Sequence, residues 1–231
     1  MKNNIIRLIL AAAAVLFLLP LAANAQTTGL PEDNPVAAPE AVVVSGNARF
    51  TVLTPRLLRL EWSEDGRFED KATLGVVNRR LDVPKLKVRK SRNRTVIETD
   101  SLRLVYSGKG KFDSSNLSVT FNMPEAGGGS HRATWHPGMD EGGNLLGTCR
   151  TLDSCDGEKT IDQFDKGVVS RDGWAVIDES ERHLLKPVDE DWKSWVENRG
   201  DGERIDWYLF AYGHDYKAAV SDFTKISGKV P

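Results

Sequence analysis

A group of carboxylates in the middle of the chain is the first set of side chains that could do chemistry. Five acidic residues fall in a stretch that also carries Gly and Cys. Two facing carboxyl groups could form a general acid/base pair, and several carboxylate oxygens could hold a cation such as calcium. A solvated acidic loop with neither role is the third interpretation. The five residues are Asp153, Asp156, Glu158, Asp162 and Asp165.

A second set of side chains surrounds a predicted turn at Arg171, Asp172, Gly173 and Trp174. A tryptophan ring offers a flat face to a pyranose ring, and a guanidinium with a carboxylate can hydrogen-bond sugar hydroxyls. An Asp-Gly pair between apolar flanks is also a strong turn signal. Asp172 could therefore serve only the turn, and Trp174 could pack in the core instead of facing a sugar.

The two cysteines of the chain, Cys149 and Cys155, lie within the acidic stretch. An oxidising compartment would allow them to form a disulfide that closes a small loop. Two unpaired thiols are the alternative. A metal site is less favoured, because two cysteines without nearby histidines make an incomplete ligand shell. We therefore predict no metal and no cofactor.

The N-terminal residues predict export. Lys2 and Arg7 precede an almost unbroken apolar run over residues 8–21, and a small-x-small cleavage pattern ends at Ala25. The run is shorter than the ~20 residues that a membrane-spanning helix needs. We expect residues 1–25 to be a signal peptide. The protein would then be periplasmic or extracellular, with no membrane attachment after cleavage.

Composition excludes some partners and suggests one domain. The chain has 231 residues, and its 31 basic and 33 acidic residues are interleaved, for a net charge of −2. It lacks the basic stripe of a nucleic-acid binder, so we expect no nucleic-acid partner. Residues 26–40 are rich in Thr, Gly, Pro and Asn and predict a flexible linker. From residue 41 onward, the length suits a single β domain.

Apolar residues that recur with a period of two predict strands in this domain. Leu58, Leu60 and Trp62 alternate with Arg59 and Glu61, which suits a half-buried strand. Short strands with turn residues between them favour an all-β sandwich or barrel. The other expected strands are residues 41–44, 48–52, 73–78, 86–90, 95–99, 102–106, 117–121 and 205–212. Residues 91–93 predict a hairpin turn, and a second hairpin is expected over 168–178. The strand over 205–212 has aromatic residues on both faces, so we expect both faces to be covered.

The last element is predicted to be an amphipathic helix. Asp215 can cap its N-terminus, and Gly228 suits its C-terminal stop. Between them, five apolar residues recur at helical spacing and form one stripe. These are Tyr216, Ala219, Val220, Phe223 and Ile226.

Three stretches in the C-terminal third resemble bacterial members of glycoside hydrolase family 31. They are residues 144–153 (NLLGTCRTLD), 170–178 (SRDGWAVID) and 206–217 (DWYLFAYGHDYK), the last followed by DFTK and GKVP. The match extends from residue 144 to the end of the chain. Residues 41–122 match the family in pattern and length only.

The family contains retaining α-glycosidases, chiefly α-glucosidases and α-xylosidases, whose two catalytic aspartates lie on a barrel. The resemblance implies that residues 41–231 form a galactose-mutarotase-like β-sandwich with one C-terminal α-helix. That helix would lead into the barrel, in cis or as a separate chain. We expect this chain to carry no catalytic residue and to be inactive alone. Arg171, Asp172, Trp174 and Asp153 are its candidate residues for binding an α-linked oligosaccharide.

Two other functions remain open. In a free-standing carbohydrate-binding module, Trp192 and Trp195 could form an aromatic platform rather than pack against an adjacent domain. An aldose-epimerase-like enzyme could use His131 or His136, which bracket Trp135, although no matching glutamate motif accompanies them. A structural histidine pair is the other interpretation of these two residues.

Overall fold

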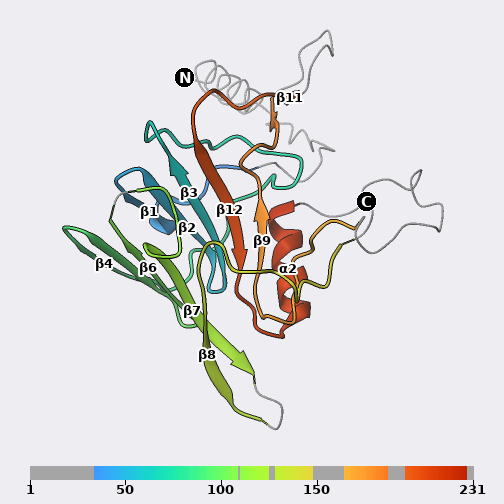
Figure 1. Cartoon of the computed structure of the whole chain (residues 1–231). Coiled ribbons are helices and arrows are strands. Elements are labelled where there is room, and N and C mark those ends of the chain that lie inside the picture. Colours follow the sequence, from blue (N-terminus) through green and yellow to red (C-terminus); the bar gives the residue numbers. More distant parts are fainter. Residues whose placement is uncertain (1–33, 109, 125–127, 148–163, 187–195, 228–231) are drawn as a thin grey trace, which may run out of the picture. The chain divides into compact units, whose positions relative to one another are not determined.

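The computed structural model describes residues 34–108, 110–124, 128–147, 164–186 and 196–227. All of them belong to one compact unit, Asp33–Pro231. Most of its regular structure lies in two five-stranded antiparallel sheets (Figure 1). A short two-stranded ribbon joins β10 (Leu184–Leu185) to β11 (Val196–Glu197), and the 3-10 turn η1 (Pro39–Ala41) precedes the first strand.

The first sheet combines strands from both ends of the domain in the order β1-β2-β3-β12-β9. The late strand β12 pairs along its whole length with β3 and also with β9, so it lies between them (Figure 1). Residues far apart in sequence therefore become neighbours in the middle of this sheet. The strands are β1 (Val42–Ser45), β2 (Ala48–Thr54), β3 (Leu57–Ser63), β9 (Ala175–Asp178) and β12 (Arg204–Phe210).

The second sheet is a simple meander in the order β4-β5-β6-β7-β8, in which each strand pairs with the next. Its middle strands alternate buried and partly exposed residues, as expected for a sheet with one face on the core and one toward solvent. The strands are β4 (Lys87–Ser91), β5 (Arg94–Glu98), β6 (Leu102–Ser107), β7 (Leu117–Pro124) and β8 (Ser130–Trp135).

The main core lies between the two sheets. The ring of Phe50 from β2 lies 5.4 Å from that of Tyr106 from β6, and Phe112 contacts both rings. These contacts join the sheets into a sandwich. Members of this core include Val52, Leu58, Leu60, Ile97, Leu104, Val119, Phe121 and Leu209.

The outer face of the first sheet is also covered, and one half of this cover is apolar. Helix α2 (Tyr216–Ser227) buries Ala219 and Ile226 against Tyr208 and Phe210. Asp215 accepts a hydrogen bond from the Ala218 amide at 3.3 Å, which caps the helix as expected.

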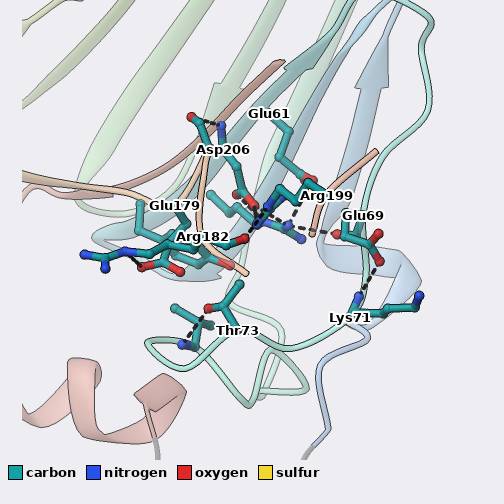
Figure 2. Close-up of polar contacts among 12 residues, drawn as sticks. Glu61, Glu69, Lys71, Thr73, Glu179, Arg182, Arg199 and Asp206 are labelled. Atoms are coloured by element: carbon teal, nitrogen blue, oxygen red, sulfur yellow. Dashed lines mark hydrogen bonds and ion pairs between the residues drawn. The ribbon is translucent and has the colours of Figure 1, made fainter. Parts of the chain in front are cut away.

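The other half of this face holds a ladder of buried ion pairs, which we call the arginine ladder: Arg49, Glu61, Arg59, Asp206 and Arg199. Arg49 donates to both oxygens of Glu61 at 2.6 and 2.7 Å. Arg59 donates to both oxygens of Asp206 at 2.7 and 2.8 Å, and Arg199 donates to the same carboxylate at 2.8 Å. Arg59 is only 1% exposed and Asp206 only 2%, so water hardly solvates either charge and each depends on its ion-pair partner. Figure 2 shows Glu61, Arg199 and Asp206 in this cluster.

The arginine ladder also holds down an irregular segment. Residues 64–81 form no named strand, yet several of their carbonyl groups face this sheet. Arg49 and Arg59 both donate to the Glu69 carbonyl, and Arg79 donates to the carbonyls of Asp70 and Lys71. Buried carbonyl groups need donors, and here guanidinium groups supply them in place of a neighbouring strand.

The all-β sandwich with a C-terminal helix is confirmed. The strands expected at the N-terminal end, the Ser91–Arg94 hairpin, and the strand over 205–212 are present within a residue or two. Both faces of β12 are covered, as its aromatic residues indicated.

Four details of the sequence interpretation are wrong. Residues 73–78 form no strand, because the amides of Val77 and Asn78 donate to the Ile226 carbonyl of the helix instead. The expected hairpin over 168–178 forms only its second arm, β9, which pairs with β12. Arg59 and Glu61 are buried rather than facing solvent, and Val220 is 47% exposed and outside the helix stripe.

Replacing Asp206 with Asn should destabilise the fold by about 3–5 kcal/mol at neutral pH, because Arg59 and Arg199 would remain buried without their counter-charge. Urea unfolding of D206N against the exposed-site control D82N measures this difference. A loss equal to that of the control would contradict the structural role of the ladder.

The same group predicts a response to acid. Burial opposes ionisation of Asp206, but Arg59 and Arg199 outweigh it and hold the pKa of Asp206 well below its usual range. Its contribution is therefore complete above the unfolded-state pKa of about 4 and is lost as the pH falls toward the folded-state pKa. The stability gap between wild type and D206N should narrow below about pH 4.

Candidate functional site

The residues singled out around the 171–174 turn lie in different environments. Arg171 is exposed and Asp172 is half-buried. Trp174 is 5% exposed, and its ring packs in the core 6.1 Å from that of Trp135. Asp153, Cys149 and Cys155 lie outside the described residues, as do Asp156, Glu158, Asp162, Trp192 and Trp195. The assignment of the described residues to substrate binding stays a prediction.

Asp172 joins its own turn to a second segment of the chain. One carboxylate oxygen accepts from the Gly143 amide at 2.8 Å and from the Ser170 hydroxyl at 3.3 Å. The Arg171 amide donates back to the Gly143 carbonyl at 2.8 Å, and Asn144 bridges to Ser170. The two segments are therefore held side by side by both backbone and side-chain hydrogen bonds.

A third segment reaches the same turn from the end of β12. The Gly213 amide donates to the Gly173 carbonyl at 2.9 Å, and His214 Nε2 lies 2.8 Å from the Arg171 carbonyl oxygen. Gly173 has a φ of +79°, and a Cβ there would fall 1.9 Å from the sulfur of Met123. Only glycine satisfies both the left-handed backbone and this close approach. We call the meeting point of these three segments the three-segment junction.

A pocket of about 500 Å³ lies at the sandwich edge formed by the last strand of each sheet. We call it the edge pocket. Trp135 from β8 and Trp207 from β12 contribute aromatic rings, which meet edge to face with centroids 6.4 Å apart. Its remaining lining residues are Pro137, Gly138, Met139, Glu141, Asp165, Lys166, Val176, Ile177, Asp178 and Arg182.

Both charge signs line the edge pocket. Lys166 Nζ lies 3.0 Å from a Glu141 carboxylate oxygen, and Asp178 is exposed on the rim with Arg182. Trp135 is only 3% exposed, so the half-buried Trp207 is the aromatic ring that a ligand could contact. One aromatic face with a few charged and hydrogen-bonding groups suits a ligand that has both apolar ring faces and hydroxyl groups. Sequence reasoning missed most of these residues, because they come from β8, β9, β12 and two loops. Of this set, it had singled out Asp165 and the neighbourhood of Trp135. Val176, Ile177, Asp178 and Trp207 fell within stretches quoted for the family resemblance, but no binding role was assigned to them.

No histidine is among the described residues that line the edge pocket, so no histidine pair is arranged there for catalysis. His131 is exposed on β8, and half-buried His136 follows the strand, with Nδ1 3.4 Å from the Pro137 carbonyl oxygen. His136 therefore lies near the pocket residue Pro137, while His214 belongs to the three-segment junction.

Glu61 and Asp206 are the carboxyl pair that most resembles an acid/base dyad. They lie opposite each other on β3 and β12, and both line a second pocket of about 460 Å³. Burial raises the pKa of Glu61, whereas the pKa of Asp206 is lowered, which is the divergence expected of an acid and a base. However, all four carboxylate oxygens accept hydrogen bonds or ion pairs from Arg49, Arg59 or Arg199. Their arrangement therefore serves the arginine ladder.

Glu179 is a second buried carboxyl group beside β9. Burial raises the pKa of Glu179, although a hydrogen bond from Thr73 and the charge of Arg182 at 3.7 Å oppose the shift. Gly75 leaves room for this carboxylate, since a Cβ there would lie 2.8 Å from Glu179 Oε1. Figure 2 shows Glu179 next to Arg182, which also lines the edge pocket.

Among the described residues, no group of three or more His, Cys, Asp or Glu side chains is arranged to hold a metal ion. In the same part of the chain, no helix is long and apolar enough to cross a membrane.

Comparisons with known proteins find similarity to solved structures alone. No protein-family model and no curated protein matches the sequence. Among solved structures, the fold resembles part of a glycoside hydrolase family 31 dextranase from Flavobacterium johnsoniae, complexed with glucose in one structure and, as a mutant, with isomaltotriose in another. The sequence identity is 13% in both, with TM-scores of 0.44 and 0.42.

The likeness covers 81% of this chain but only 27% of the dextranase chain. This chain thus spans far less than two thirds of that enzyme. Similarity at this level carries no argument about substrate or activity.

Removing the Asp172 carboxylate should loosen the three-segment junction. In D172A, the Gly143 amide loses its acceptor, so we expect a loss of about 1–3 kcal/mol in stability and faster hydrogen exchange at that amide. The exposed neighbour D140A provides the matched control. Unchanged exchange at Gly143 would show that Asp172 does not hold the two segments together.

Glu179 should make the fold less stable as the pH rises. A raised folded-state pKa means that deprotonation above the ordinary glutamate pKa of about 4.3 costs more in the fold than in the unfolded chain. We expect E179Q to match wild type near pH 4 and to exceed its stability at pH 7, as judged by urea unfolding. Equal stability of the two proteins at pH 7 would argue against a destabilising charge.

Proposed function

We propose that this chain is the non-catalytic N-terminal β-sandwich of an exported family 31 retaining α-glycosidase. In this role it borders the substrate entrance and supports a catalytic barrel, in cis or as a separate chain. The proposal rests on one observation above all. Described residues of all three stretches that carry the family resemblance, separate in sequence, lie in the three-segment junction.

The contacts of that junction support a shared structural role for these stretches. Asn144 opens the first stretch, Ser170 and Asp172 belong to the second, and Gly213 and His214 to the third. The β-bridge between Asn144 and Ser170 joins the first stretch to the second, and hydrogen bonds to the adjacent Gly143 support it. Hydrogen bonds join the second stretch to the third. A turn that is fixed from three sides is a rigid support for loops beside it, and loops on rigid β scaffolds often carry binding residues.

Exposed apolar side chains near the junction support the presence of a partner domain. Met139, Leu145 and Phe164 are each 36–39% exposed, and they belong to the two loop segments that flank the edge pocket. A docked partner domain could cover apolar residues of this kind. A barrel docking over these loops would cover them and bring its substrate site next to the edge pocket.

This function places the catalytic carboxyl pair on the barrel. A retaining mechanism needs two carboxyl groups roughly 5 Å apart and free to act on the sugar. In the described part of this chain, the best-placed pair, Glu61 and Asp206, is held by arginines. The sandwich would contribute by positioning the substrate, not by chemistry.

The purified chain should not hydrolyse aryl α-glucosides or α-xylosides above the uncatalysed rate. The readout is release of the aryl alcohol, with a family 31 enzyme as the positive control. Turnover at an enzyme-like rate that an acid-to-amide change in this chain abolishes would overturn the proposal. DNA sequencing around the reading frame should also find a barrel with a catalytic aspartate pair.

A free-standing carbohydrate-binding module is the second candidate, and the half-buried Trp207 ring at the edge pocket favours it. It predicts a monomer that binds α-linked glucan or xyloglucan fragments without any partner. Titration calorimetry of wild type, D178N and the exposed-site control D82N separates the two functions. Binding weakened about tenfold by D178N alone would favour the module. If no heat of binding is measured and the chain aggregates, the result would favour an accessory domain that is separated from its barrel.

A further inference from the structure

A long polar groove lies on the outer face of the second sheet, and the proposed function does not use it. Its volume is about 810 Å³. The strand register places one polar side chain from each strand in a single row across the sheet, which spans about 19 Å at the usual strand spacing of about 4.8 Å. From β4 to β8, the row is Lys87, Glu98, Arg103, Thr120 and Thr134.

The groove carries an excess of positive charge. Four cations line it against two carboxylates, Glu98 and Asp100. Glu98 is shared by two guanidiniums, since Arg89 donates to one oxygen at 2.6 Å and Arg103 to the other at 3.1 Å. Glu98 is therefore already paired, with the groove cation Arg103 and with Arg89, which lies outside the groove lining. The four cations are Lys85, Lys87, Arg103 and Arg132.

The other lining residues carry hydroxyl groups (Thr99, Ser101 and Thr120), an amide (Asn122) and two apolar side chains (Leu86 and Leu102). Asn122 stands directly opposite Arg132 on β7 and β8, and both side chains are exposed. The hydroxyls of Thr120 and Thr134 lie 3.1 Å apart. No aromatic side chain is among the described residues that line this groove. A ligand here must therefore be held by hydrogen bonds and charge rather than by ring stacking.

We propose that this groove binds an acidic oligosaccharide, in which uronate carboxylates alternate with sugar hydroxyls. Arg103 and Arg132 would bind carboxylates in a bidentate manner, while Asn122 and Thr120 would bond hydroxyls. This site goes beyond the proposed function and is separate from the edge pocket, because its residues alternate along β7 and β8 with those that face the core.

The same observations disfavour other anionic ligands. A single-stranded nucleic acid relies on aromatic platforms for its bases, which the described lining lacks. An acidic peptide that adds to a sheet would pair with an edge strand, whereas this groove runs across the face. A hydroxyl-rich anion matches the alternation of cations with Thr and Asn.

Titration calorimetry of the full chain with an oligogalacturonate tests the proposal. We expect binding at about 50 mM NaCl that weakens steeply at about 500 mM, since exposed charges are screened by salt. R132Q and R103Q should each lower the affinity about tenfold. R92Q, which removes the same charge in the exposed β4–β5 turn, is the matched control and should bind like wild type.

Several outcomes would overturn the inference. They are no heat with oligogalacturonate, equal affinity for neutral maltohexaose, or tighter binding of polyglutamate or single-stranded DNA at the same salt concentration. Failure of the proposed function is measured separately, in the aryl α-glycoside hydrolysis assay. D178N in the edge pocket should leave oligogalacturonate binding intact, which separates this groove from the edge pocket. Circular dichroism of R103Q and R132Q confirms that a loss of affinity is not a loss of fold.

Discussion

The bidentate ion pair between Arg59 and Asp206 is the interaction on which the first sheet depends. It joins β3 to β12, whose residues lie far apart in sequence, on a face that excludes water. A buried pair contributes little net energy compared with apolar packing, but loss of one partner is severe. The pair therefore favours one pairing of the two strands. Arg59 and Asp206 meet only when β3 and β12 align in the observed register.

Arginines also explain how an irregular stretch can cover a sheet. The carbonyl groups of Glu69, Asp70 and Lys71 accept from Arg49, Arg59 and Arg79 where a regular strand would have used a neighbour's amides. The apolar half of the same face needs no such device, because helix α2 satisfies its own backbone. One face is thus closed in two ways, by side-chain donors at one end and by a helix at the other.

The sequence predicts features that depend on neighbours along the chain. The helix at residues 216–227 follows from a local cap and stripe, and the β4–β5 hairpin from a local turn. The burial of Arg59 and Glu61 could not be predicted, because a period of two looks the same whether the polar face meets water or a partner 147 residues away. The edge pocket could not be predicted either, because its lining residues come from strands and loops that are far apart in sequence. Asp172 was singled out from its turn, but its acceptor role toward Gly143 depends on a loop 29 residues earlier.

The strand order has a consequence for the sequence of events as the chain is made. The second sheet is built from consecutive hairpins and can form as soon as residue 135 has emerged from the ribosome. The first sheet lacks its fourth strand until residue 210 arrives. Until then, β3 has one open edge and Arg59 has no Asp206. The domain therefore completes its most demanding electrostatic contacts last, from a half that is already folded.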